Sequence, residues 1–230
     1  MEREIALLKE VWRRIAAAAE RAGRRPDDIR LLAVSKGQPV EKIRAFRRAG
    51  ATLFGENYVQ EFLEKYEVLR DDDIRWHFIG RLQTNKVKYI VDKVECIHSV
   101  DSLKLAEEIE RQAVKHGIAK MPILLQVNIG KEATKGGAAA DETVVLYRAV
   151  STLDRIEVRG LMTLPPFLEP EEVRPYFRRL RELRDRIVRE EKAGPVRFSE
   201  LSMGMSHDFE VAVEEGATIV RLGTILFGGR

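Results

Sequence analysis

The sequence predicts an α/β protein, a single (β/α)8 TIM barrel over residues 1–230 with an extra helix before the first strand. Short apolar runs of strand length alternate along the chain with segments whose apolar residues recur every three or four positions. Eight such runs occur, and a helical pattern follows each except the last. This repeat requires parallel strands with right-handed crossovers, which close most naturally into a barrel. A doubly wound open sheet is the alternative, and no Gly-x-Gly-x-x-Gly motif follows a strand to favour a dinucleotide site.

The extra helix is expected at residues 2–22. Its apolar residues, among them Ile5, Leu8 and Val11, have helical spacing, and Gly23 closes the pattern. We expect this helix to lie across the body of the barrel.

The first strand is predicted at residues 31–34, where four apolar residues follow one another without alternation. Such a run is typical of a strand buried on both faces. Lys36 comes directly after it, at the carboxyl edge where α/β folds place their chemistry. A lysine in this position is also typical of a simple strand-end charge that reaches solvent.

The other elements follow in alternation. Strands are predicted at 51–54, 75–80, 94–98, 123–129, 156–163, 198–203 and 217–222. Helices are predicted at 39–49, 58–70, 83–92, 101–116, 140–153, 171–192 and 206–215. The arginines of 171–192 alternate with acids at helical spacing, which indicates an ion-paired helix face and not an RNA-binding arm.

Composition favours a protein of the cytoplasm. The chain is 44% hydrophobic and 33% charged, and its net charge is only +3, so a basic surface for nucleic acid is not indicated. No apolar stretch approaches the roughly 20 residues of a membrane span, and the N-terminus lacks a signal-peptide core. The single cysteine, Cys96, suits a reducing compartment.

Polar residues gather where the predicted strands end, and in a barrel those ends meet at one face. Barrels often bind phosphate with the loops after strands seven and eight, here residues 202–206 and 223–224. Lys36 lies on strand one, the neighbour of strand eight. A lysine amine beside a phosphate site suggests a Schiff base to a phosphorylated aldehyde or ketone. Both a phosphosugar and pyridoxal phosphate fit this pattern.

Seven sequence motifs bear on the choice between these two ligands. They lie at residues 33–36, 54–60, 76–80, 82–86, 160–163, 201–206 and 220–224. In this order they resemble the pyridoxal phosphate homeostasis protein family, the single-domain relatives of the alanine racemase barrel. The match runs from about residue 30 to the C-terminus, and Arg81 stands where relatives vary.

The resemblance implies a pyridoxal 5′-phosphate (PLP) site. It implies that Lys36 holds the cofactor as a Schiff base and that Arg221 faces the pyridine nitrogen. The remaining residues that it implies for the site are Ser202, Gly223 and Thr224 at the phosphate, and Asn57 and Met162 beside the ring.

Four further residues are assigned no part in catalysis or metal binding. We expect structural roles for His77 and His207. A metal site of His77, His98 and Cys96 is not expected, because the strand spacing suggests that these residues do not converge.

The predicted function is binding, buffering and delivery of PLP, without catalysis. Racemases of the related fold add a second acid/base, a tyrosine from a domain after the barrel. We expect this second domain and its tyrosine to be missing, because the chain ends at Arg230, directly after the eighth unit. The expected partners are PLP and, transiently, apo-enzymes that need it, with no nucleic acid, no membrane and a monomeric chain. The alternatives are a racemase-like enzyme with Lys36 as its sole base, and a phosphosugar aldolase using Lys36 with Glu56.

Overall fold

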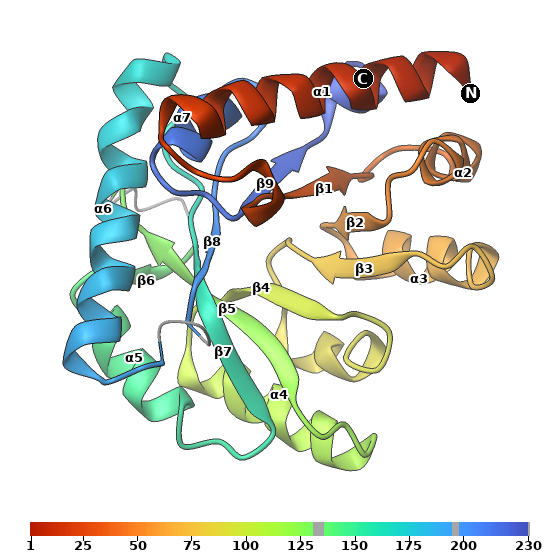
Figure 1. Ribbon diagram of the computed structural model, residues 1–230. Coiled ribbons are helices and arrows are strands. Elements are labelled where there is room, and N and C mark those ends of the chain that lie inside the picture. Colours follow the sequence, from red (N-terminus) through yellow and green to blue (C-terminus); the bar gives the residue numbers. More distant parts are fainter. Residues whose placement is uncertain (131–135, 195–197, 230) are drawn as a thin grey trace.

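A computed structural model describes residues 1–130, 136–194 and 198–229 and contains a closed barrel of eight parallel strands (Figure 1). The barrel strands are β1 (Arg30–Val34), β2 (Leu53–Glu56), β3 (Arg75–Phe78), β4 (Cys96–Val100), β5 (Met121–Asn128), β7 (Ile156–Met162), β8 (Glu200–Ser202) and β9 (Ile219–Leu222). Pairing of β1 with β9 and of β4 with β5 closes the ring. The predicted barrel is therefore confirmed, and the open sheet is excluded.

Helices surround the strands much as the apolar spacing predicts. They are α1 (Glu2–Arg21), α2 (Val40–Arg48), α3 (Val59–Val68), α4 (Leu103–Lys115), α5 (Thr143–Val150), α6 (Pro170–Glu190) and α7 (Phe209–Glu214). Three short elements were not predicted: the 3-10 helix η1 (Pro26–Asp28), the two-residue strand β6 (Ala138–Ala139) and the single turn α8 (Thr224–Phe227).

The segment between β3 and β4 differs from the prediction. It forms the 3-10 helix η2 (Thr84–Tyr89) instead of the α-helix expected at 83–92. Its buried residues Val87 and Ile90 are three positions apart, and this spacing places them on one face of a helix with three residues per turn.

Helix α1 lies along the outside of the barrel, beside α7 and over β1 and β9 (Figure 1). Ile15 is completely buried along this contact, and Arg14 and Arg21 pair with Glu210 and Glu214 of α7 at 3.1 and 2.6 Å. The first helix thus packs its apolar face against the body of the barrel and contacts α7, the helix that follows β8.

Helix α6 carries the arginine-rich face. Arg174 and Arg178 both pair with Glu215, at 3.4 and 2.9 Å. The interpretation of this segment as an ion-paired helix face is confirmed.

The barrel interior forms a small apolar core of its own, separate from the larger core between strands and helices. Its members are Leu32, Val34, Leu53, Ile79, Cys96, Leu124, Met162 and Ile219. The strands are therefore buried on both faces, which explains why their sequences run apolar without alternation. Within the described residues, no helix is both long enough and apolar enough to cross a membrane.

Candidate functional site

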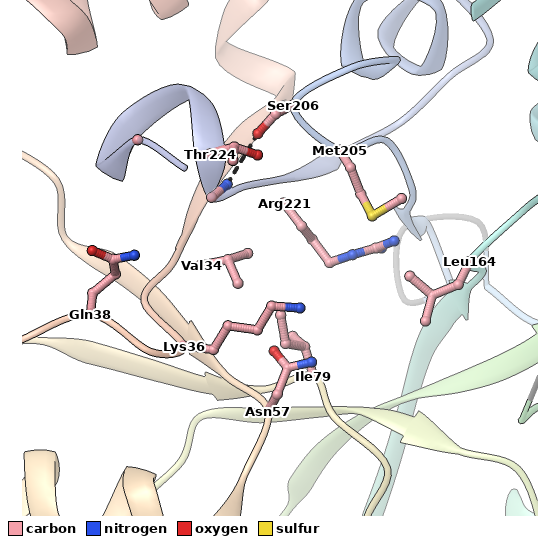
Figure 2. Close-up of a pocket in the computed structure, with 12 residues that line it drawn as sticks. Val34, Lys36, Gln38, Asn57, Ile79, Leu164, Met205, Ser206, Arg221 and Thr224 are labelled. Carbon is pink, nitrogen blue, oxygen red and sulfur yellow. Dashed lines mark hydrogen bonds between the residues drawn. The ribbon is translucent and has the colours of Figure 1, made fainter. Parts of the chain in front are cut away.

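A cavity of about 240 Å³ opens where β1, β2 and β9 end (Figure 2). Its volume is just below the range of about 300–1,000 Å³ typical of ligand pockets. The residues around it are Val34, Lys36, Gln38, Asn57, Ile79, Leu164, Met205, Ser206, Arg221, Gly223, Thr224 and Gly228. Five of the seven predicted site residues are among them. The other two, Ser202 and Met162, are fully buried and do not line the cavity.

Lys36 stands in the turn directly after β1, and its side chain extends into the cavity (Figure 2). The turn requires a glycine next, because Gly37 has φ +68°. Among the described residues the Lys36 amine has no recorded hydrogen bond or ion pair. It is therefore available to a ligand.

The peptide groups on both sides of Lys36 are held by helix α3. Lys65, 5% exposed, donates to the Ser35 carbonyl at 2.6 Å. The Gly37 N–H donates to the carboxylate of Glu61. These bonds fix the backbone of the lysine while leaving its side chain free.

Beneath this turn lies a buried ion cluster. Lys65 Nζ lies 2.7 Å from Oε1 of both Glu56 and Glu61, and the Ser35 hydroxyl donates to Glu56 at 2.7 Å. Burial raises the pKa of Glu56, and the Lys65 ammonium opposes that shift. Sequence reasoning missed Lys65, although its four-residue spacing from Glu61 is the pattern of a helical ion pair.

Arg221 borders the cavity opposite Lys36 (Figure 2). Its guanidinium donates to the Ser202 hydroxyl at 2.7 Å and to the Thr163 carbonyl at 2.8 Å. Burial lowers the pKa of Arg221 to about 10, so it remains charged at neutral pH. No ion pair to Arg221 occurs among the described residues, but the buried Asp208 carboxylate stabilises its charge from beyond ion-pair distance.

Ser202 belongs to a hydrogen-bonded chain inside the barrel. Its hydroxyl lies 3.0 Å from His98 Nδ1, and His98 Nε2 lies 2.8 Å from His77 Nδ1. Arg221 already donates to Ser202, so the serine satisfies its own proton by donating to His98. His98 then donates to His77, and every bond runs in one direction. Burial lowers the pKa of His77 to about 3 and that of His98 well below its usual value, so both rings are neutral.

The expectation that His77, His98 and Cys96 do not converge is wrong. One ligand atom from each lies within 4.8 Å of the others, because His77 is directly opposite Cys96 on the paired strands β3 and β4, and His98 follows two residues later on the same side. The imidazoles of His77 and His98 are hydrogen-bonded to each other. Burial raises the pKa of the Cys96 thiol. That the chain holds no metal here stays a prediction.

Ser206 connects the two loops predicted to bind phosphate. Its Oγ accepts hydrogen bonds from the backbone N–H of Gly223 at 3.3 Å (Figure 2) and from that of Ile225 at 3.2 Å. Because its lone pairs are engaged, the serine has its proton left to donate, which suits an anion. The sequence analysis identified this loop but selected Ser202 for the phosphate site. The sequence of a loop after a strand does not show which of its serines faces the cavity. His207, next in the chain, packs on Phe167 with ring centres 5.2 Å apart and does not line the cavity.

Asn57 lies beside Lys36 and has an unpartnered group. Its Oδ1 is buried with no hydrogen bond, which is costly unless a ligand or water satisfies it. Gly80 permits its position, because a Cβ there would stand 2.0 Å from the Asn57 carbonyl oxygen.

The comparisons with known proteins agree on one family. Residues 8–230 match the family model described as alanine racemase, N-terminal domain. A curated relative from Aquifex aeolicus, named pyridoxal phosphate homeostasis protein, is 55% identical, with 97% of this chain and 96% of the relative covered. One of the same name from Pseudomonas aeruginosa is 43% identical, with 97% and 94% covered.

Solved structures give the same result. An unknown protein from Bifidobacterium adolescentis is 40% identical with a TM-score of 0.91, covering 98% of this chain and 95% of that one. PipY of Synechococcus elongatus, solved with PLP bound, is 38% identical with a TM-score of 0.81, covering 93% and 100%. The alanine racemase of Clostridium difficile, 16% identical with a TM-score of 0.72, shares the fold and covers 100% of this chain but only 57% of its own. The chain belongs to the pyridoxal phosphate homeostasis protein family.

Proposed function

We propose that residues 1–230 form one PLP-binding domain that buffers the cofactor in the cytoplasm and delivers it to apo-enzymes. The observation that carries this proposal is the meeting of Lys36, Asn57, Arg221, Gly223 and Thr224 around one cavity. The PLP-bound structure of PipY, 38% identical over 93% of this chain, supports the choice of ligand.

The residues around the cavity fit PLP group by group. Lys36 would hold PLP, whose aldehyde would form a Schiff base with the lysine amine as water is released. Ser206 and Thr224 supply hydroxyl donors for the phosphate, and Gly223, whose N–H donates to Ser206, lets the backbone come close to it. Ser202 does not line the cavity and instead accepts a hydrogen bond from Arg221. Arg221 suits the ring nitrogen, and the unpartnered Oδ1 of Asn57 suits a donor on the ligand. Met162 is part of the apolar core inside the barrel and does not line the cavity.

Storage is favoured over catalysis. PLP supplies an electron sink for amino-acid chemistry, and that sink is strongest when its ring nitrogen is protonated. A charged Arg221 donating to the nitrogen disfavours this protonation. No tyrosine lines the cavity within the described residues, so a second acid/base of the racemase kind has no candidate there. An aldolase is also disfavoured, because Glu56 is occupied by Lys65 and Ser35 and does not line the cavity.

The test is Lys36→Ala, with Lys104→Ala as the control at an exposed lysine of α4. We expect Lys36→Ala to abolish both the visible absorbance of bound PLP and the mass increase after borohydride reduction. Folding should persist, because Lys36 is exposed and outside the core. A full borohydride adduct in folded Lys36→Ala would move the Schiff base to another lysine.

A test for catalytic turnover distinguishes the carrier function from a racemase activity. A carrier of this kind binds one PLP per chain and leaves L- and D-alanine unchanged over long incubation, as we expect. Racemisation that disappears in Lys36→Ala would establish the enzyme instead. The monomeric state that we propose is checked by light scattering on the loaded protein.

A further inference from the structure

A second, larger cleft adjoins the cofactor cavity. It has a volume of about 760 Å³, and Asn57 borders both spaces. Its lining residues are Asn57, Tyr58, Val59, Gln60, Leu63, Arg81, Gln83, Lys86 and Tyr89. They come from the start of α3 on one side and from the loop and 3-10 helix η2 after β3 on the other. The proposed cofactor site uses only Asn57 of this set.

The two walls of the cleft are sequence motifs that, apart from Asn57, do not line the first cavity. Residues 54–60 and 82–86 are two of the seven motifs noted in the sequence, and the cleft lies between them. Their close approach depends on Gly80, where any Cβ would collide with the Asn57 backbone. The cleft is thus formed by the same backbone contact that places Asn57.

The charge of the cleft favours an anion. Arg81 and Lys86 are both exposed, and neither has a recorded ion pair among the described residues. Among the residues that the structure describes, no carboxylate lines the cleft. The exposed amide of Gln83 adds neutral hydrogen-bond donors.

The cleft also offers aromatic surface. The side chains of Tyr58 and Tyr89 are 60% and 42% exposed, and Lys86 Nζ lies 5.7 Å from the centre of the Tyr89 ring. Exposed tyrosine rings beside cations suit a ligand that combines a flat ring with a negative group.

We propose that this cleft is a second, non-covalent site for a phosphorylated pyridine, the same ligand class as the proposed cofactor. This inference rests on the proposed function and adds a place where the phosphate ester is held next to Lys36 without being bonded to it. Arg81 and Lys86 bind the phosphate, and the tyrosine rings contact the pyridine.

The experiment uses 4-deoxypyridoxine 5′-phosphate, which has the ring and the phosphate but no aldehyde. The full chain is first loaded with PLP and reduced with borohydride, so that the cavity at Lys36 is permanently filled. Titration calorimetry should then show one further molecule of the probe bound per chain. Arg81→Ala with Lys86→Ala should weaken this binding by about 10–100-fold, because two charge-assisted contacts are lost.

The control is Arg48→Ala with Lys104→Ala, which removes the same charge at two exposed positions away from the cleft. We expect this pair to bind the probe as the parent does. Equal weakening in both double variants would overturn the proposal, since only the net charge would then matter. Absence of probe binding to the reduced protein would overturn it as well.

Two further ligands test the ring and the phosphate separately. Inorganic phosphate and pyridoxine should each bind at least about 10-fold more weakly than the probe if both parts contribute. If inorganic phosphate binds as tightly as the probe, the cleft recognises only an anion and the proposal is contradicted. If borohydride fixes no PLP at Lys36, the proposed function fails on its own, and the cleft is tested by asking whether the probe's affinity for unreduced protein still depends on Arg81 and Lys86.

Discussion

Arg221 is held by two neutral oxygens, those of Ser202 and Thr163. A carboxylate in either place would cancel the guanidinium charge within the barrel, whereas a hydroxyl and a carbonyl orient the group and leave its charge intact. The neutral histidines His98 and His77 continue this hydrogen-bonded chain beyond Ser202. They provide a partner for the serine hydroxyl without introducing a charge. The side chain is thereby presented to the cavity as a fixed cation.

The phosphate end of the site gives a prediction at the same scale. Replacing Ser206 by Ala and Thr224 by Val should weaken PLP binding by about 1–3 kcal/mol for each hydrogen bond to the phosphate that is lost. Pyridoxal, which lacks the phosphate, should bind nearly as it does to the parent. Affinities from equilibrium dialysis of both ligands check this. Equal losses for PLP and pyridoxal would show that these hydroxyls do not contact the phosphate.

The sequence shows which strand ends carry polar residues, but not which side each residue faces. Lys36 was singled out because it directly follows a buried strand, and Arg221 because of the resemblance to the family. Ser206 and Lys65 were not, since their roles depend on a loop returning to a neighbouring loop and on a helix packing beneath a turn. Such contacts join residues far apart along the chain and leave no local pattern.

At the scale of elements, α3 acts as a support for the turn that carries Lys36. Its Lys65 neutralises Glu56, which is completely buried. Lys65→Met should therefore lower the free energy of unfolding by about 3–5 kcal/mol, because it leaves a buried carboxylate without its partner. Urea unfolding measures the loss.

Two companion variants identify the cause of that loss. Adding Glu56→Gln to Lys65→Met should restore part of the stability, because the unpaired buried charge is then gone. Lys88→Met, at an exposed lysine of η2, should change stability by no more than about 0.5 kcal/mol. A double variant as unstable as Lys65→Met alone would contradict the ion-cluster explanation.

The barrel strands were predictable because each is a short, continuous apolar run, and the α-helices α1 to α7 because their apolar residues recur every three or four positions. The elements that were missed are too short to show one: β6 has two residues, η1 three and α8 four. In η2 a period was present but misassigned, since residues three apart fit both an α-helix and a 3-10 helix.

For the whole molecule, the buried histidines predict sensitivity to acid. The pKa of His77 falls to about 3 on folding, and that of His98 is also strongly lowered. The unfolded chain, with histidine pKa near 6.5, therefore binds protons first as pH falls. The stability contributed by these neutral rings is complete above about pH 6.5 and is lost below it, by about 1.4 kcal/mol per pH unit for each histidine.

His77→Gln tests this by removing one of the two titrating groups. Urea unfolding at several pH values between about 7 and 4 should give a shallower loss of stability than in the parent, because one proton-binding group of the unfolded chain is gone. His116→Gln, at an exposed histidine, should retain the parent's slope. An unchanged slope in His77→Gln would show that His77 does not titrate on unfolding.

The ring of strands closes between β1 and β9, the first and last strands of the chain. Lys36 and Arg221 therefore meet only after the final βα unit has left the ribosome, because the earlier units supply one side of the cavity alone. A chain still being synthesised can present the lysine but cannot surround a cofactor with both sides of the site. If the protein binds PLP as proposed, we expect loading to follow the synthesis of β9, because only then do both sides of the cavity exist.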